Sequence, residues 1–471
     1  MCPYDLRAYS FLGWKAGGRA IEGMKILLVS LGCDKNLVDS EVMLGLLAKE
    51  GYTFTDDETQ ADIAVINTCC FINDAKEESI NTILEIAELK KAGQIKALIV
   101  TGCLAQRYQE EIQKEIEEVD AIIGTAAIDK IASAIEDALN ANTADAGKYF
   151  EPLDRKPAGN RKRIMTTGGH FAYLKIAEGC DKNCTYCVIP KVRGPYRSIP
   201  MEELVAEAEA LVQEGAKELI LVAQETTLYG KDLYGEKMLP ALLERLCGIK
   251  KLRWIRILYC YPEEITDELI QVMKRESKIC HYLDIPVQHG SDRILKRMGR
   301  RTDSGEIRRI VEKLRENIPD ICLRTTLITG FPGETEEDFE NLMDFVDEME
   351  FDRLGVFTYS MEEDTPAAAM PDQLEEDIKE ERRNAVMELQ QEIAYEAAER
   401  MVGRKLTAMI EGKVADEDAY VARTYKDAPN VDGYLFISTD RQLITGEFVD
   451  VRITGSYEYD LIGELCDEST E

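Results

Sequence analysis

The strongest constraint on the fold is an alternation of strand and helix patterns that repeats about six times between residues 171 and 360. The strand patterns are short runs rich in β-branched and aromatic residues, and they read FAYLKIA, ELILVAQ, RWIRILY, HYLDIPV, LRTTLITG and DRLGVFTYS. Strands that are joined through helices form parallel sheets. The repeats therefore predict a complete or partial (β/α) barrel, in which the chemistry lies at the carboxyl ends of the strands.

A shorter alternation covers residues 24–140, with the strand runs KILLVSL, ADIAVINT, ALIVTG and AIIGT. It predicts a separate parallel α/β sheet with helices on both faces. Residues 141–165 are irregular, which is typical of a linker. We expect the basic residues of this linker to form a solvated connector; they are Arg155, Lys156, Arg161, Lys162 and Arg163.

The pattern changes again near Gly403, where short strands separated by turn signals predict a small antiparallel β-barrel. A long charged helix is expected just before it, over about residues 372–400. A chain of 471 residues is long enough for several domains. The expected division is an upstream extension without a fixed fold at 1–23, an α/β domain at 24–140, the linker at 141–165, the barrel core at 166–397 and the small β-barrel at 399–467.

Composition favours a cytoplasmic protein with no membrane partner. The sequence has no apolar run of the roughly 18 residues that span a bilayer, and its beginning lacks the apolar stretch of a secretory signal. In a reducing compartment its 13 cysteines are expected to ligate metals rather than to form disulfides. The net charge of −32 weighs against a nucleic-acid substrate and favours a basic partner, although many cytosolic proteins are acidic for solubility.

Three cysteines lie close together in EGCDKNCTYC, directly after the first strand of the predicted core: Cys180, Cys184 and Cys187. Three thiolates on a short loop can hold three irons of a 4Fe–4S cluster and leave the fourth iron open for a small ligand. A structural zinc site normally takes four protein ligands. The three histidines of the sequence form no ligand pair, so an iron–sulfur cluster is the favoured interpretation.

A second set of cysteines is spread over the N-terminal domain, at the ends of three predicted strands: Cys33, Cys69 and Cys103. The carboxyl ends of neighbouring parallel strands meet at one edge of a sheet, so these thiols are expected to converge on a second cluster. Buried structural cysteines are the alternative. Cys70 competes with Cys69, but successive strand residues point to opposite faces, so only one of the two should face the site.

The compact motif, with Tyr186 before its last cysteine, resembles the radical S-adenosylmethionine (SAM) superfamily. The resemblance implies that SAM binds the open iron and is cleaved by one electron to a 5′-deoxyadenosyl radical. Gln224-Glu225 is similar to the segment that contacts the methionine amine, and Gly330-Phe331-Pro332-Gly333 is similar to the loop near the adenine. The SAM contacts implied are Tyr186, Gln224, Glu225, Gly330 and Gly333; ordinary strand-to-helix turns are the alternative for each segment.

The three predicted domains together resemble the methylthiotransferases, whose small terminal barrel is the OB-like TRAM domain. This resemblance implies two 4Fe–4S clusters, with Cys69 rather than Cys70 as a ligand, and two SAM molecules per turnover. One branch of the family modifies an isopentenylated adenosine in transfer RNA. The other inserts a methylthio group at the β-carbon of an aspartate in ribosomal protein S twelve, and the segments LGCDKNLVDSE, QETTLYG and DAPNVDG are similar to that branch.

Charge supports the protein-modifying branch independently. Residues 401–471 contain 7 basic and 15 acidic residues, a net charge of −8, which suits a basic ribosomal protein better than RNA. Candidate contacts are Asp427, Asp432, Asp450 and Asp460, although a solvated acidic face is the favoured alternative for each of them. An electron donor such as flavodoxin or ferredoxin is also expected. The remaining alternative, a non-catalytic iron–sulfur protein, normally holds each cluster with four ligands.

Several charged residues near the compact motif are further candidates for contact with cofactor or substrate, although the sequence does not rank them: Lys175, Glu178, Arg193, Arg197 and Arg301.

Overall fold

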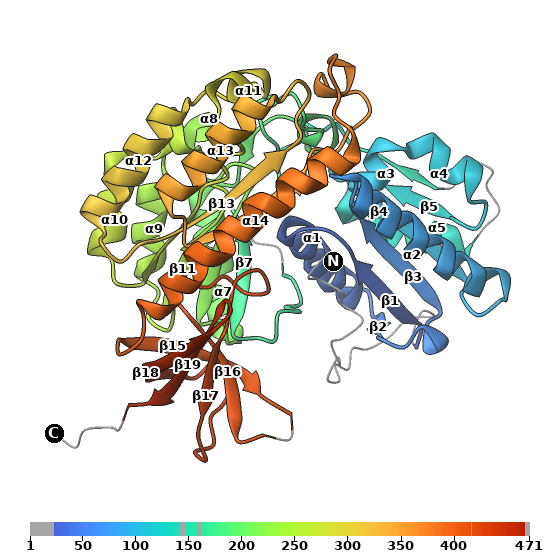
Figure 1. The fold of residues 1–471 in the computed structure, drawn as a ribbon. Helices are drawn as coiled ribbons and strands as arrows, with labels where there is room; N and C mark the ends of the chain where they lie inside the picture. Colours follow the sequence, from blue (N-terminus) through green and yellow to red (C-terminus); the bar gives the residue numbers. More distant parts are fainter. Residues whose placement is uncertain (1–22, 141–146, 158–161, 416, 467–471) are drawn as a thin grey trace.

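The computed structural model describes residues 23–140, 147–157, 162–415 and 417–466. Apart from Gly23, the expected upstream extension lies outside these residues. The described chain forms two parallel sheets with helices and one closed β-barrel, shown in Figure 1. In this part of the chain, no helix has the length and apolar character needed to cross a membrane.

The N-terminal domain is a six-stranded parallel sheet in the order β2-β1-β3-β4-β5-β6. Its strands are β1 (Lys25–Ser30), β2 (Thr53–Phe54), β3 (Ile63–Thr68), β4 (Ala97–Gly102), β5 (Ala121–Ile123) and β6 (Lys148–Tyr149). Its helices are α1 (Asp34–Lys49), α2 (Asn73–Lys91), α3 (Cys103–Arg107), α4 (Gln109–Glu115) and α5 (Ile131–Leu139). The four predicted strands are confirmed; β2 and β6 have two residues each, too few to carry a periodic pattern.

The core is a second six-stranded parallel sheet in the order β14-β13-β12-β11-β10-β7. Its strands are β7 (Phe171–Lys175), β10 (Glu218–Val222), β11 (Trp254–Ile257), β12 (Ile279–Asp284), β13 (Cys322–Thr329) and β14 (Arg353–Thr358). The two end strands, β7 and β14, do not pair with each other, so the barrel is partial. A short antiparallel pair, β8 (Ala177–Glu178) with β9 (Arg197–Ser198), follows β7.

Helices cover the outer face of the core sheet and follow the strands as the alternation predicts (Figure 1). The helices of this domain are α6 (Ile189–Arg193), α7 (Met201–Glu214), α8 (Lys231–Tyr234), α9 (Leu239–Cys247), α10 (Asp267–Arg275), α11 (Asp292–Arg297), α12 (Ser304–Asn317), α13 (Glu336–Met349) and α14 (Glu376–Glu399). Helix α6 instead packs against the N-terminal domain, where Val192 joins the buried cluster of Val29 and Ile66. Both α12 and α13 begin at a capping box, formed by Asp303 with Glu306 and by Thr335 with Asp338. The charged helix expected over 372–400 is α14.

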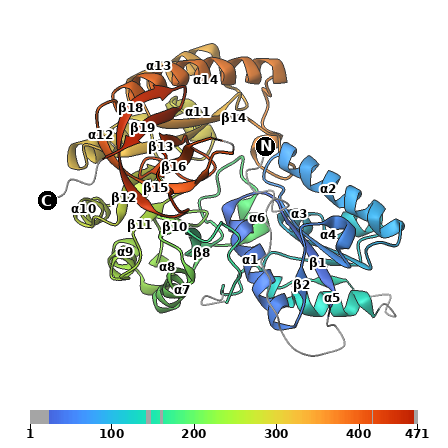
Figure 2. The same ribbon diagram turned by 90° about the horizontal axis from the view of Figure 1, so that it is seen from below.

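Helix α1 occupies the inner face of the core sheet, between the two sheets in Figure 2. Its apolar residues Leu37 and Val38 share one buried cluster with Tyr173 of β7 and Ile220 of β10. The polar residues at the start of α1 are buried as well: Asp34, Lys35, Asn36, Asp39, Ser40 and Glu41. The N-terminal domain therefore contributes a helix to the interior of the core.

The linker residues Arg155, Lys156 and Lys162 are exposed, as expected, and Arg161 lies outside the described residues, but Arg163 is buried. Arg163, expected in a solvated connector, is only 4% exposed; its guanidinium donates to the Tyr173 carbonyl oxygen and lies 3.5 Å from carboxylate oxygens of Glu41 and Glu207. Since Glu41 belongs to α1 and Glu207 to α7, Arg163 links the N-terminal domain to the core.

The C-terminal domain is a closed five-stranded barrel in the order β15-β16-β17-β19-β18. Its strands are β15 (Lys405–Lys413), β16 (Ala419–Thr424), β17 (Leu435–Ser438), β18 (Phe448–Tyr457) and β19 (Asp460–Leu465). All pairings are antiparallel except that of β17 with β19. The barrel docks on the amino ends of the core strands, where the Trp254 and Phe448 rings contact edge-to-face at 4.8 Å.

Candidate functional site

The compact cysteine loop leaves β8 at the carboxyl end of the first core strand. Gly179 has φ +79°, and a Cβ there would stand 2.1 Å from the Pro195 carbonyl oxygen, so the turn requires glycine. The Cys180 N–H donates to the Gly194 carbonyl oxygen at 3.1 Å, and the Cys187 N–H donates to the Cys184 carbonyl oxygen at 3.0 Å. These bonds fold the loop so that Cys180, Cys184 and Cys187 lie together.

The surroundings of these thiols fit an iron–sulfur cluster. All three are free, and Cys180 and Cys184 are buried. Burial raises the pKa of Cys180 to about 11 and also raises the pKa of Cys187, so these thiols become thiolates only when a metal displaces the proton. Arg300 Nη1 lies 3.9 Å from the Cys184 sulfur and brings a positive charge to the site.

Within the described residues, no three His, Cys, Asp or Glu side chains are grouped to hold a single metal ion. A cluster makes a different demand, because each thiolate binds its own iron and the sulfur atoms need not meet at one point.

The residues implied as SAM contacts lie around this loop. The Tyr186 ring meets the Phe331 ring edge-to-face at 6.4 Å, which joins the cysteine loop to the Gly330–Gly333 turn. Both glycines have positive φ, +72° and +78°. Glu334 fixes the turn by accepting hydrogen bonds from the N–H groups of Gly330 and Phe331 at 2.9 and 3.2 Å.

Gln224 and Glu225 follow β10 and have different environments. The Gln224 side chain accepts from the Gly179 N–H at 2.9 Å and donates to Glu178 at 3.0 Å, so it supports the base of the cysteine loop. Glu225 is fully buried, and its Oε2 has no hydrogen-bond partner among the described residues, with Lys182 Nζ 3.9 Å away. Burial raises the pKa of Glu225 to about 7. A buried carboxylate oxygen without a donor fits a cationic ligand such as the amine of SAM.

The dispersed cysteines lie at one edge of the N-terminal sheet, after the adjacent strands β1, β3 and β4. Cys33 precedes the first residue of α1, Cys69 follows β3, and Cys103 begins α3. Burial, followed by the charges of Cys103 and Cys33, raises the pKa of Cys69 well above its usual value. The three sulfur atoms are therefore electrostatic neighbours, as expected from their positions at strand ends.

Cys70 differs from Cys69 in its packing. Cys70 belongs to the apolar cluster that includes Val29, Ile66 and Leu104, whereas Cys69 lies against Gly32, next to Cys33 in the chain. Cys103 belongs to the same cluster as Cys70, so the contact of Cys69 with Gly32, next to Cys33, is the observation that supports Cys69 as the member of the triad.

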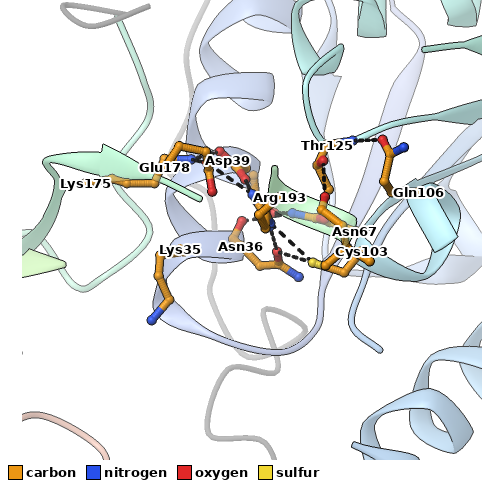
Figure 3. Close-up of polar contacts among 12 residues, drawn as sticks. Lys35, Asn36, Asp39, Asn67, Cys103, Gln106, Thr125, Lys175, Glu178 and Arg193 are labelled. Carbon is orange, nitrogen blue, oxygen red and sulfur yellow. Dashed lines mark hydrogen bonds and ion pairs between the residues drawn. The ribbon is translucent and has the colours of Figure 1, made fainter. Parts of the chain in front are cut away.

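A buried polar network runs from Cys103 through Arg193 and Glu178 to Gln224, at the base of the compact cysteine loop, and Figure 3 shows the part of it around Arg193. Its centre is Arg193, at the end of α6, whose Nε donates to the Cys103 sulfur at 3.3 Å. Burial opposes the charge of Arg193, but Cys103, Glu178 and Asp39 outweigh it and hold the Arg193 pKa well above its usual value. A cavity of about 60 Å³ lies beside the network and is lined in part by Asp39, Lys175 and Glu178.

The loop after β14 joins the same two sites on another side. Glu362 is 1% exposed, and its carboxylate accepts from Lys76 at 3.0 Å and from Arg107 at 2.7 Å. In the same loop, the Ala367 N–H donates to the Thr185 carbonyl oxygen at 2.9 Å. The loop therefore connects the N-terminal domain to the compact cysteine loop. Nothing in the spacing of Glu362 or Arg193 distinguishes them in the sequence from other charged residues.

Two of the four barrel aspartates expected to contact a partner are instead buried against the core. Asp427 is 2% exposed and pairs with Arg353 at 2.7 Å, and Asp432 accepts from the Tyr282 hydroxyl at 2.7 Å. They hold the barrel to the core, because their segment follows β16 into the interface. Asp450 is exposed and pairs with Lys405, and Asp460 accepts from the Tyr434 N–H.

Comparison with protein families divides the chain in three. Residues 25–124 match the Uncharacterized protein family UPF0004, residues 174–346 match the Radical SAM superfamily, and residues 402–466 match the TRAM domain.

Two relatives cover nearly the whole chain. The chain is 62% identical over 440 residues to the ribosomal protein uS12 methylthiotransferase RimO of Lachnoclostridium phytofermentans. This match covers 93% of this chain and 99% of the relative. It is 50% identical to the protein of the same name from Acetivibrio thermocellus, over 95% of this chain and 99% of the relative.

Solved structures share the fold at low identity. The radical SAM methyltransferase TsrM from Kitasatospora setae, with cobalamin and a 4Fe–4S cluster bound, has a TM-score of 0.54 and 15% identity, over 74% of this chain and 77% of that one. The cobalamin-dependent radical enzyme OxsB has a TM-score of 0.51 and 14% identity, over 79% of this chain and 56% of that one.

Proposed function

The chain belongs to the family of ribosomal protein uS12 methylthiotransferases, which are radical SAM enzymes, and we propose that it inserts a methylthio group at the β-carbon of an aspartate in that ribosomal protein. The reaction takes place in the cytoplasm, uses two 4Fe–4S clusters and consumes two SAM molecules per turnover. The observation that most supports this proposal is the presence of two three-cysteine sites joined across one buried interface.

In the proposed site, Cys180, Cys184 and Cys187 hold one cluster, and Cys33, Cys69 and Cys103 hold the other. When bound, the clusters and SAM supply one-electron chemistry and the methylthio sulfur and methyl groups. The protein binds and orients them. The carboxylate of Glu225 pairs with the SAM amine, while Gln224 keeps the cysteine loop in position. Tyr186 and the turn from Gly330 to Gly333 flank the adenine.

The overall change replaces one C–H bond of the aspartate by one C–S bond. The hydrogen atom would leave in 5′-deoxyadenosine, made from one SAM, the methyl group would come from the other and the sulfur from sulfide, and the electron released when the C–S bond forms would be taken up by the second cluster. A small electron-transfer protein such as flavodoxin or ferredoxin supplies the electron that starts each cycle. No proton-transferring side chain is needed to remove hydrogen as an atom.

The charge of the C-terminal barrel supports a basic protein over transfer RNA as substrate. Acidic side chains are exposed at the turns that join its strands, and they include Glu417, Asp418, Asp440 and Glu458. Such a surface attracts a basic ribosomal protein and repels phosphate groups.

The proposal is tested by incubating the anaerobically reconstituted enzyme with purified uS12, SAM, sulfide and a reductant. Mass spectrometry should find one added methylthio group on one aspartyl peptide. A variant with Cys180, Cys184 and Cys187 replaced by alanine should add none. A parallel reaction contains transfer RNA in place of uS12. If uS12 stays unmodified and an adenosine of the transfer RNA gains a methylthio group, the proposal is wrong and the enzyme belongs to the other branch of the family.

A further inference from the structure

Arg193 is a buried cation held between the two domains. It is the last residue of α6, is 2% exposed, and belongs to the core, yet three of its neighbours come from the N-terminal domain. Its Nε donates to the Cys103 sulfur at 3.3 Å, its Nη1 donates to Asp39 at 2.7 Å, and its Nη2 donates to the Asn36 side-chain oxygen (Figure 3). Each guanidinium nitrogen therefore donates a hydrogen bond to a residue of the N-terminal domain.

Arg193 shares its two carboxylate partners with a second cation. Asp39 and Glu178 lie beside two cations, Arg193 and Lys175: Arg193 Nη1 is 3.3 Å from Glu178, and Lys175 is 2.8 Å from Glu178 and also pairs with Asp39. Two carboxylates thus neutralise two cations. The Nε–H group is left to point at Cys103, and a neutral thiol is only a weak acceptor. A negatively charged sulfur, such as a cluster ligand, would accept it strongly.

The position of Arg193 is fixed from both domains. Thr125 of the N-terminal domain donates to the carbonyl oxygen of Val192 at 2.6 Å, directly before Arg193. Gly194, directly after it, has φ +76°, and a Cβ there would stand 2.6 Å from the Leu153 carbonyl oxygen. The backbone is held on both sides of Arg193, so the guanidinium has little freedom to leave the sulfur.

We propose that Arg193 is a positioning residue for the cluster of the N-terminal domain, and that its Nε–H bond to the Cys103 sulfur raises the reduction potential of that cluster. The inference rests on the proposed second cluster. A hydrogen bond and a positive charge at a ligand sulfur stabilise the reduced, more negative form of an iron–sulfur cluster. Arg193 also binds Glu178, which accepts from Gln224, so it connects the second cluster to the SAM side of the core.

The test uses the full chain with Cys180, Cys184 and Cys187 replaced by alanine, so that only the second cluster is loaded. Its midpoint potential is measured by an electron paramagnetic resonance titration, with Arg193 intact, as Arg193→Gln and as Arg193→Lys. Arg163→Gln is the matched control, because Arg163 is a buried arginine of the same interface whose polar contacts are to oxygen.

In Arg193→Gln the potential should fall, so that the ratio of reduced to oxidised cluster at a fixed potential drops about tenfold, or about 59 mV for one electron. Arg193→Lys keeps the charge but not the directed Nε–H bond, so its shift should be smaller. Arg163→Gln should leave the potential unchanged. If Arg193→Gln does not fold, the midpoint potential of Arg193→Lys is compared with that of Arg163→Gln. A larger fall in Arg193→Lys supports the proposal, and an equal shift in both variants overturns it.

Two results are kept apart by this design. An unchanged potential in the Arg193 variants, or an equal shift in Arg163→Gln, would overturn the role of Arg193 while leaving the second cluster in place. Absence of iron and sulfide from the triple-alanine chain with Arg193 intact would instead remove the second cluster, and with it the proposed function.

Discussion

Cys69 lies directly against the Cα of Gly32. A Cβ at residue 32 would stand 2.6 Å from the Cys69 Cβ and 2.9 Å from its sulfur, closer than such atoms approach in proteins. Gly32 also has φ +91°, which other residues adopt only with strain. Cys69 can therefore take its position only because residue 32 has no side chain. Residue 32 directly precedes Cys33, another proposed ligand.

Gly32→Ala should therefore displace Cys69 and lower the iron content of the reconstituted protein by about half, since one of two clusters is lost. The strained backbone should also cost about 1–2 kcal/mol in the free energy of unfolding. Gly51→Ala is the control, because Gly51 has a similar φ of +96° and open space around its Cα. It should lose stability but keep its iron, and equal iron loss in both variants would contradict the prediction.

Cys103→Ala should also remove about half of the iron and sulfide, because it deletes a ligand of only one cluster. Production of 5′-deoxyadenosine from SAM should continue, since the other cluster is intact. Cys70→Ala should keep the full iron content, because Cys69 and not Cys70 lies against Gly32, next to Cys33. Iron and sulfide analysis with an assay for 5′-deoxyadenosine checks all three statements. Normal iron in Cys103→Ala would exclude Cys103 as a ligand.

Glu225→Gln should weaken SAM binding by about tenfold to a hundredfold, the usual range for a lost hydrogen bond to a charged group. The reason is that Oε2 of Glu225 has no hydrogen-bond donor in the part of the chain that the structure describes, and Lys182 Nζ is 3.9 Å away. Equilibrium dialysis of cluster-loaded protein measures the dissociation constant. Glu264→Gln is the control, because Glu264 also contacts Lys182, at 2.5 Å. An equal loss in both variants would assign the effect to Lys182 instead.

Glu218→Ala should destabilise the protein by about 3–5 kcal/mol, because it leaves two buried arginines without their shared carboxylate. Glu218 is fully buried and lies 2.8 Å from both Arg256 of the core and Arg423 of the barrel. Asp450→Asn should cost at most about 1 kcal/mol, because its pair with Lys405 is exposed. Denaturant unfolding compares the two, and similar losses would refute the expectation.

The same carboxylate predicts how stability depends on pH. Burial opposes ionisation of Glu218, but Arg423 and Arg256 outweigh it and lower its pKa below the usual value of 4.5. A lowered pKa in the folded state adds stability above about pH 4.5, and this contribution is lost as the pH falls through the lowered pKa. The difference in unfolding free energy between the native protein and Glu218→Gln should therefore shrink below about pH 4.5. A difference that stays constant down to pH 3 would contradict this.

The sequence was sufficient to predict which cysteines meet, because the result depends only on strand order. Cys33, Cys69 and Cys103 each follow a strand, and the ends of adjacent parallel strands share one edge. Strand alternation alone does not choose between Cys69 and Cys70; the family resemblance implies Cys69, and the contact of Cys69 with Gly32 supports it. The cysteine loop could likewise be predicted from its spacing, but the unpaired oxygen of Glu225 could not.

The docking of the domains could not be predicted from the sequence, because the interfaces bury polar residues whose local pattern indicates a solvent-exposed surface. Asp34, Asn36 and Asp39 give the start of α1 the polarity of a solvent-facing helix, yet all three are buried. Asp432 carries a charge that suggested a surface contact, and it lies inside the junction of barrel and core. In each case a partner from a distant segment compensates for burial, and no local window of sequence contains that partner.

Helix α1 ends at Lys49, but the sheet whose inner face it covers is completed only by β14, at Thr358. During synthesis the ribosome adds roughly 300 residues between these points, which takes about 15–60 s at about 5–20 residues per second. Leu37 and Val38 share their buried cluster with Tyr173 of β7 and Ile220 of β10, so the side of α1 that faces the core stays uncovered at least until β10 has been made. The nascent chain therefore has to keep its first helix from aggregating while the strands of the core are still being synthesised.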